Sequence, residues 1–159
     1  MNAITDYIDT AYHESGHAIA AAELGIVVFA DVTHTAEHLG ICQFQRVTNP
    51  THRVAIALAG PLAAWEARRR DGEMLGAAAS ADLRSIDKLL AKVHGVTVTA
   101  ENRTAFPEWT VGRKLAWDVI GKNWGAIIHV ANWLREHKRA SGHLIHACLA
   151  CNKLPEIGE

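Results

Sequence analysis

Two histidines stand four residues apart near the N-terminus, in the stretch AYHESGHA. On an α-helix, residues separated by four positions differ by about 40° in azimuth and about 6 Å in height. His13 and His17 would therefore point the same way from a helix, one turn apart. Gly16 and Ala20 leave a small surface on that helix, so that a second helix can pack closely against it. We expect such packing to fix the orientation of the two imidazole rings.

The pattern His-Glu-x-x-His is typical of zinc hydrolases. Two imidazole nitrogens can bind one Zn²⁺ at about 2.0–2.1 Å each. Glu14 follows His13 directly, in the place where a base takes a proton from zinc-bound water. The pattern can also arise by chance in a chain with ten histidines, in an ordinary helix. By itself it names neither a third ligand nor a substrate.

Length and composition predict a single globular domain over residues 1–159. Apolar residues make up 49% of the chain and charged residues 21%, which is ordinary for a globular protein. The formal net charge of −1 provides no field that would attract nucleic acid or an anionic membrane. We therefore expect neither as a partner.

The cysteine count and the N-terminus predict a cytoplasmic protein. Three cysteines are too few, and odd in number, for a disulfide framework, which favours a reducing compartment. The N-terminus lacks the basic and apolar regions of a signal peptide. The longest apolar stretch, residues 18–32, contains Glu23 and Asp31 and is too short to span a bilayer.

The first half of the chain predicts two helices around a β-hairpin. The first helix is expected to begin near Asp9 or Thr10 and to run to Leu24. Two strands should follow, over residues 25–34 and 41–47. A second helix is expected over residues 51–69, kinked or divided by Pro61, and small residues along it would let another helix come close.

The second half predicts three more helices. Ser80 can cap a helix over residues 81–93. A polar, irregular stretch should lead to one long helix over residues 110–137, weakened locally by Gly121 and Gly125. A short helix is expected over residues 143–150, followed by a flexible tail over residues 152–159. The predicted class is mainly α-helical with a small β-hairpin or sheet.

A catalytic zinc site needs three protein ligands and one open position. The third ligand could come from an acid on the second or third helix, or from a histidine near the hairpin. These candidates are Glu66, Asp82, Asp87, His34, His38 and His52.

Several blocks, in the same order, resemble the protease domain of the membrane-anchored AAA+ zinc peptidases (FtsH-type peptidase family M41). The resemblance covers roughly residues 7–146, and its most specific blocks contain the two histidines and Asp82. The blocks are AYHESGHAIAAAELG, DVTHTAEHLGICQF, VAIALAGPLAAWEA, SADLRSIDKLL and GKNWGAIIHVANWLREHKRASGHLI.

This resemblance implies an FtsH-protease-domain-like zincin that binds one Zn²⁺ per chain through His13, His17 and Asp82. Glu14 would be the catalytic base. Asp82 would lie in the first turn of its helix, where free amides favour an ionised carboxylate. Asp87, five residues later on another face, is the alternative third ligand.

The chain departs from this family in one respect that bears on its substrates. It contains no phosphate-binding GxxxxGK[ST] loop, so no ATP-driven unfolding is expected. The resemblance then implies an ATP-independent endopeptidase that cuts flexible or unfolded polypeptides, either as a homo-oligomer or with a partner that delivers substrate. The alternative is a zinc-binding regulatory or adaptor domain of the same fold with little turnover.

Two further sets of residues are candidates for the reaction. If the second strand is a sheet edge beside the zinc, an extended peptide can add to it by backbone hydrogen bonds. The residues of this candidate edge are Gly40, Ile41, Cys42, Gln43 and Phe44. His34 or His38 could donate a hydrogen bond to the tetrahedral intermediate. Cys148 and Cys151 are more simply explained by a local helix than by a second metal or redox site.

Overall fold

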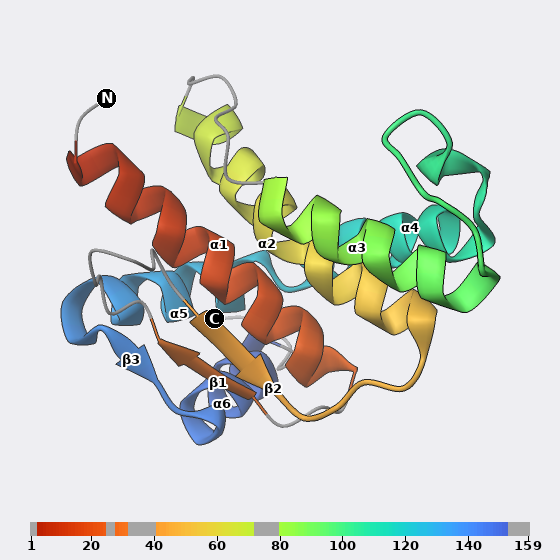
Figure 1. Ribbon diagram of the computed structural model, residues 1–159. Helices are drawn as coiled ribbons and strands as arrows, with labels where there is room; N and C mark the ends of the chain where they lie inside the picture. The colour runs from red at the N-terminus through yellow and green to blue at the C-terminus, as the bar shows by residue number, and fades with distance from the viewer. Residues whose placement is uncertain (1–2, 25–27, 32–40, 72–79, 153–159) are drawn as a thin grey trace.

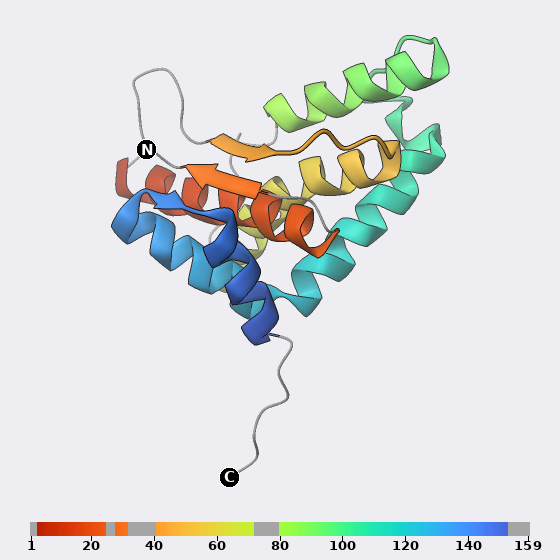
Figure 2. The same ribbon diagram turned by 90° about the horizontal axis from the view of Figure 1, so that it is seen from below.

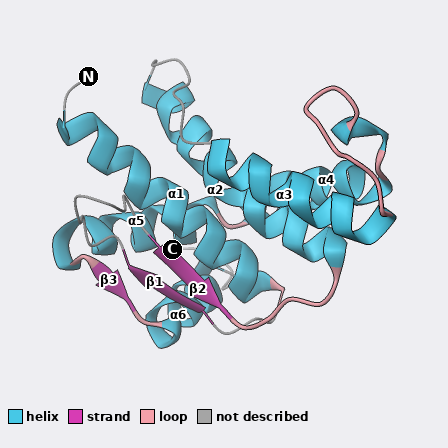
Figure 3. Cartoon of the chain, viewed as in Figure 1, coloured by secondary structure: helices cyan, strands magenta, loops and turns pink. Residues whose placement is uncertain are grey.

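The computed structural model describes residues 3–24, 28–31, 41–71 and 80–152, and it is mainly helical with one small sheet (Figures 1 and 3). This confirms the predicted class. The helices are α1 (Ala3–Glu23), α2 (Pro50–Asp71), α3 (Ser80–His94), the 3-10 helix η2 (Arg103–Ala105), α4 (Pro107–Lys122), α5 (Trp124–His137) and α6 (Gly142–Asn152). The strands are β1 (Val28–Asp31), β2 (Ile41–Phe44) and β3 (Arg139–Ala140).

Helix α1 lies at the centre of the molecule and contacts α2, α4, α5, α6, β1 and β2. Figure 1 shows it crossing between the sheet and the pair α2 and α3. Residues 14–22 of this helix are all buried, and most of them are small or apolar. The fully buried residues in this range are Ser15, Ala18, Ile19, Ala20 and Ala21.

The start of α1 differs from the prediction. The helix begins at Ala3 and not at Asp9 or Thr10. Residues of these two types favour the N-cap because their side chains can bind free amides, yet the same side chains are tolerated within a helix. Thr10 is buried within the helix, so here it is an interior residue and not a cap.

Helices α1 and α2 pack with their backbones unusually close at Gly16. A Cβ atom on Gly16 would lie 2.7 Å from the Cβ of Ala63 and 2.9 Å from the carbonyl carbon of Ala59. The small residues of both helices therefore permit this approach, as their positions predicted. Helix α2 runs without division through Pro61, contrary to one expectation. Proline removes one helical hydrogen bond, and α2 contacts α1 and α4 both before and after this point.

The sheet has the strand order β2-β1-β3, and both pairings are antiparallel. In the central strand, Ala30 pairs with Cys42 on one side and with Ala140 on the other. Strand β2 thus lies at an edge of the sheet among the described residues, which meets the condition set for substrate addition. It is shorter than the expected strand over residues 41–47. Residues 25–27 and 32–34 of the other expected strand lie outside the described residues. Strand β3 was not predicted.

The predicted long helix over residues 110–137 is in fact two helices, α4 and α5, separated at Asn123. This residue has φ −117° and ψ 23°. Its buried amide donates through Nδ2 to the carbonyl of Val119 at 3.0 Å. Nδ2 of Asn152 donates to the carbonyl of Lys122 at 2.9 Å. The carbonyl of Val119 also accepts from the backbone N–H of Asn123 at 3.0 Å. The two side-chain amides thus add hydrogen bonds to the last turn of α4, so a break is stable where the sequence suggested only weakness.

Helix α3 packs on α2 and α4 through a second apolar cluster. Its apolar residues lie on one face, which includes Ile86 and Leu90, and the opposite face is exposed. Figure 2 shows α3 at the surface of the molecule, on the same side as β2. Within the described ranges, none of the helices combines the length and apolar character needed to cross a lipid bilayer. The expected flexible tail lies outside the described residues, except for Asn152 at the end of α6.

The close contact of α1 and α2 makes Gly16→Ala destabilising. The added methyl group must push two helices apart, which should lower the free energy of unfolding by about 1–3 kcal/mol. The matched control is Gly121→Ala, because a Cβ at Gly121 would meet nothing within 4 Å. This control should raise the free energy of unfolding by about 0.5–1 kcal/mol, because alanine favours a helix more than glycine does. Urea unfolding followed by circular dichroism measures both, and equal stability of the two variants would contradict the packing argument.

Candidate metal centre

Three side chains from two helices converge at one point. His13 and His17 extend from α1, and Asp82 extends from the first turn of α3. The Nε2 atoms of the two histidines are 3.0 Å apart. Oδ2 of Asp82 lies 3.1 Å from Nε2 of His13, and Oδ1 lies 3.5 Å from Nε2 of His17. The structure therefore brings together the three residues that the sequence and its family resemblance singled out.

These separations suit a tetrahedral metal ion. Two ligand atoms at about 2.0–2.1 Å from such an ion are about 3.4 Å apart. Imidazole nitrogen and carboxylate oxygen are ligands of the kind that Zn²⁺ takes. The three atoms all carry lone pairs, so their close approach is unfavourable unless a cation or a shared proton lies among them. The group of His13, His17 and Asp82 could thus hold a metal ion.

The ring of His17 is oriented by the backbone of α2. Its Nδ1 atom lies 2.7 Å from the carbonyl oxygen of Ile56. Since a carbonyl only accepts, Nδ1 carries the proton and donates, which leaves the lone pair of Nε2 directed at the other two ligands. Burial and the nearby charge of His13 both lower the pKa of His17. His17 is therefore held in the neutral form that binds metals.

Gly60 gives the ring of His17 its space. A Cβ atom at this position would lie 2.5 Å from Cε1 and 2.7 Å from Cδ2 of the ring. Gly60 also follows Ile56 by one helical turn, so its missing side chain opens the way to the Ile56 carbonyl. The ring of His13 has no comparable support, because its buried Nδ1 has no hydrogen-bond partner among the described residues.

Glu14 lies beside this group and is only 6% exposed. Burial raises the pKa of its carboxyl to about 7, with opposing smaller effects from His17 and Asp82. A carboxyl that titrates near neutral pH can both accept and release a proton. Glu14 is thus placed as the sequence pattern predicted, beside the three candidate ligands and not among them.

Two of the other acids proposed as third ligands are paired elsewhere. Asp87 accepts two hydrogen bonds from Arg103, from Nε at 2.5 Å and from Nη2 at 2.6 Å. Glu66 accepts two from Arg69, each at 2.9 Å. His52 does not join the group of candidate ligands within the described ranges. Of the candidates in these ranges, Asp82 alone lies with the two histidines.

The candidate substrate strand lies beside Glu14. Residues 41–44 form β2, and Gly40 lies outside the described residues, as do His34 and His38. Cys42 packs against the core around α1. Its burial and the charge of Glu14 raise the pKa of its thiol, which makes it a poor nucleophile. Gln43 and Phe44 are exposed.

The cysteines of α6 do not form a second centre in the part of the chain that is described. Cys148 and Cys151 are free thiols, one partly buried and one exposed. No metal-binding group forms around them among residues 142–152.

No protein-family model matches this chain, and no curated protein sequence matches it significantly.

Three contributions to the site were missed in the sequence. The carbonyl of Ile56 has no side-chain signal, so only the fold reveals it. Gly60 is one of the small residues along the second helix that were expected to let another helix come close, and nothing in this run indicated that it faces an imidazole. Arg103 stood in a stretch expected to be irregular, far from its partner Asp87.

The two acids of α3 can be separated by zinc binding. Asp82→Asn should lower zinc affinity by about 100-fold or more, because it removes a charged ligand without changing the shape of the side chain. Asp87→Asn should keep the affinity of the natural sequence, since its carboxylate pairs with Arg103. Titration calorimetry with ZnCl₂ measures both. Loss of binding in Asp87→Asn alone would show that the third ligand is misassigned.

Gly60→Ala should weaken zinc binding by about 10- to 100-fold, the range expected when the support of a histidine ligand is disturbed. The added methyl group forces the ring of His17 away from the Ile56 carbonyl. Gly121→Ala serves again as control and should bind zinc normally. Unchanged zinc affinity in Gly60→Ala would mean that the ring does not need this space.

Proposed function

We propose that this chain is a zinc-dependent, ATP-independent endopeptidase with the zincin fold of the FtsH-type protease domain. The observation that carries the proposal is the convergence of His13, His17 and Asp82 with Glu14 buried next to them. A group of three candidate ligands occurs at many metal sites. The adjoining buried carboxyl is the feature that hydrolysis needs in addition.

The roles of the residues follow from their positions. His13, His17 and Asp82 would hold Zn²⁺, which would supply a Lewis acid for a peptide carbonyl and for water. Glu14 accepts the proton of the attacking water and passes it to the leaving amine. The backbone of α2 holds His17 in place through Ile56. The burial of Glu14 limits its contacts with solvent.

The edge position of β2 supports a polypeptide as substrate. An extended chain added to Ile41–Phe44 would form backbone hydrogen bonds beside Glu14. Such bonds depend little on side-chain identity, so recognition at this strand requires an extended conformation more than a particular sequence. Flexible or unfolded polypeptides present that conformation without prior unfolding.

Glu14→Gln tests the proposal directly. The variant keeps the shape of the side chain and the three candidate ligands, so it should bind one zinc ion like the natural sequence. It should hydrolyse unfolded casein about 10²- to 10⁴-fold more slowly, because the proton acceptor is lost. Casein cleavage and zinc content are measured on the same preparations.

The outcomes separate the proposed enzyme from other roles. Zinc in both proteins, with cleavage by neither, would support a zinc-binding regulatory or adaptor domain in place of the peptidase. Equal cleavage by both would exclude Glu14 as the base. Absence of zinc from both, after incubation with ZnCl₂ and dialysis, would refute the metal centre.

A further inference from the structure

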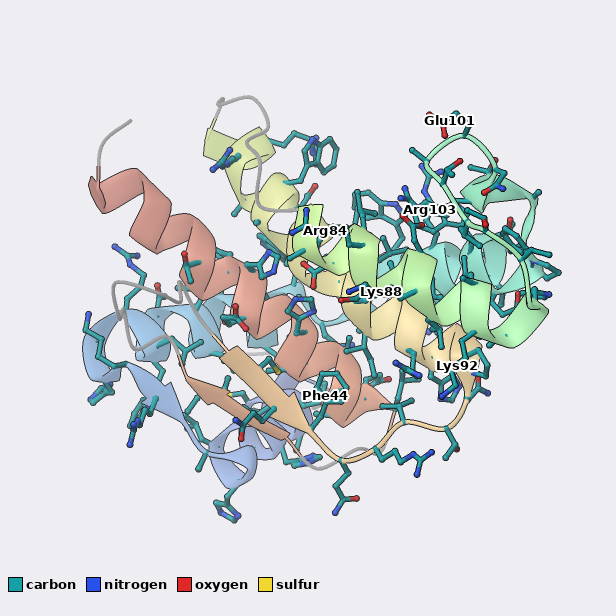
Figure 4. The ribbon with its side chains drawn as sticks, viewed as in Figure 1. Phe44, Arg84, Lys88, Lys92, Glu101 and Arg103 are labelled. Atoms are coloured by element: carbon teal, nitrogen blue, oxygen red, sulfur yellow. The ribbon has the colours of Figure 1, made fainter. Side chains whose placement is uncertain are left out.

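A row of three cations follows the exposed face of α3. Arg84, Lys88 and Lys92 are separated by four residues each, so they lie on adjacent turns of one side of the helix. All three are exposed. Figure 4 shows them in line along α3, with Phe44 of β2 on the same face of the molecule.

These cations have no acidic partner in the part of the chain that the structure describes. The two acids of the same helix are committed elsewhere, Asp82 to the candidate metal centre and Asp87 to Arg103. Residues 41–60, which contain β2 and the start of α2, include no Asp or Glu. They add two exposed cations, Arg46 and Arg53. Among the described residues, this face is therefore locally positive although the chain carries a net charge of −1.

The row begins next to the candidate metal centre and extends away from it in one direction. Arg84 follows Asp82 by two residues, and Lys92 lies near the end of α3. Figure 1 shows α3 and β2 on the two flanks of α1, and Figure 2 shows that both lie toward the same face. A peptide added to β2 beside Glu14 would thus have the cations of α3 on its other side.

The spacing of the row matches an extended chain. Neighbouring cations are about 6 Å apart along the helix axis, from four residues at a rise of about 1.5 Å. Alternate residues of a β-strand, whose side chains share one face, are about 6.6 Å apart. Three acidic side chains at alternate positions of a bound strand would therefore each meet one cation.

We propose that Arg84, Lys88 and Lys92 form a subsite for acidic polypeptide segments, with Asp or Glu at alternate positions on one side of the scissile bond. The inference rests on the proposed function, since it extends the site of that peptidase. The subsite would restrict the proposed class of substrate from unfolded polypeptides in general to those with an acidic stretch near the bond that is cut.

A peptide fits this surface better than a nucleic acid. The adjacent edge of β2 offers backbone hydrogen bonds, which a polypeptide can pair and a nucleic acid cannot pair in the same repeating way. Single-stranded nucleic acids are commonly bound by several aromatic side chains that stack on the bases. Phe44 is the only aromatic residue between Ile41 and Gly60, and α3 has none.

The binding test uses two fluorescein-labelled dodecapeptides, one with Glu at three alternate positions and one with Gln at the same positions. The full-length Glu14→Gln variant, loaded with zinc, binds without cutting. Fluorescence anisotropy in 50 mM salt should show about tenfold tighter binding of the Glu peptide, as expected for three exposed ion pairs. The difference should vanish in 500 mM salt. Equal binding of the two peptides in 50 mM salt would overturn the proposal.

Charge variants locate the effect. The triple variant Arg84→Gln, Lys88→Gln, Lys92→Gln should lose the preference for Glu, and the single variant Lys88→Glu should reduce it. The control Arg113→Gln, Lys114→Gln, Lys122→Gln removes the same charge from α4 and should keep the preference. Equal loss in the control would mean that overall charge, and not this row, is responsible. Tighter binding of a twelve-residue oligothymidine than of the Glu peptide, abolished in the α3 triple variant, would also overturn the proposal.

This inference and the proposed function fail separately. Peptide binding requires no turnover, so the anisotropy result decides the subsite even if the natural sequence cuts no casein. If it does cut, mass spectrometry of the products from a random peptide library should show Asp and Glu enriched on one side of the cleaved bond. Enrichment on both sides or on neither would refute the subsite and leave the peptidase intact.

Discussion

The close packing of α1 on α2 is the contact on which the candidate site depends. Gly16 allows the two backbones to approach, and this approach brings the carbonyl of Ile56 within 2.7 Å of the His17 ring. Helix α2 also provides Gly60, whose lack of a side chain leaves room for the His17 ring. A wider spacing of these helices would leave His17 without its hydrogen bond to the Ile56 carbonyl. The geometry of the candidate site therefore depends on the packing of α1 against α2.

A metal ion in this group would also act on the fold. His13 and His17 belong to α1, whereas Asp82 belongs to α3, which packs mainly on α2. An ion held by all three would join two helices that share little other contact and would close the chain between His17 and Asp82 into a loop. Such links stabilise a fold by restricting the unfolded chain, and the effect increases slowly with loop length. Binding and stability would then depend on each other.

The sequence predicted the features that are local and missed those that come from tertiary contacts. The spacing of His13 and His17 predicted a helix with both rings on one face, and small residues on two helices predicted their close packing. The break at Asn123 was missed because a buried amide and Asn152, distant in sequence, stabilise it. Asp82 and Asp87 could not be separated by residue type. The resemblance to a known family favoured Asp82 as the third ligand. The pairing of Asp87 with Arg103 is visible only in the structure.

The partner of His17 is a main-chain atom, and this has a consequence for how the sequence can vary. A side chain that orients a histidine ligand through a hydrogen bond is lost by a single substitution. The carbonyl at position 56 is present whichever residue occupies that position, provided that α2 remains helical there. The identity of residue 56 is then free to follow the needs of the apolar core, where Ile56 is now buried. The residue that must be kept is Gly60, one turn away, because any side chain there would meet the His17 ring. Substitution should therefore be tolerated at position 56 and not at position 60.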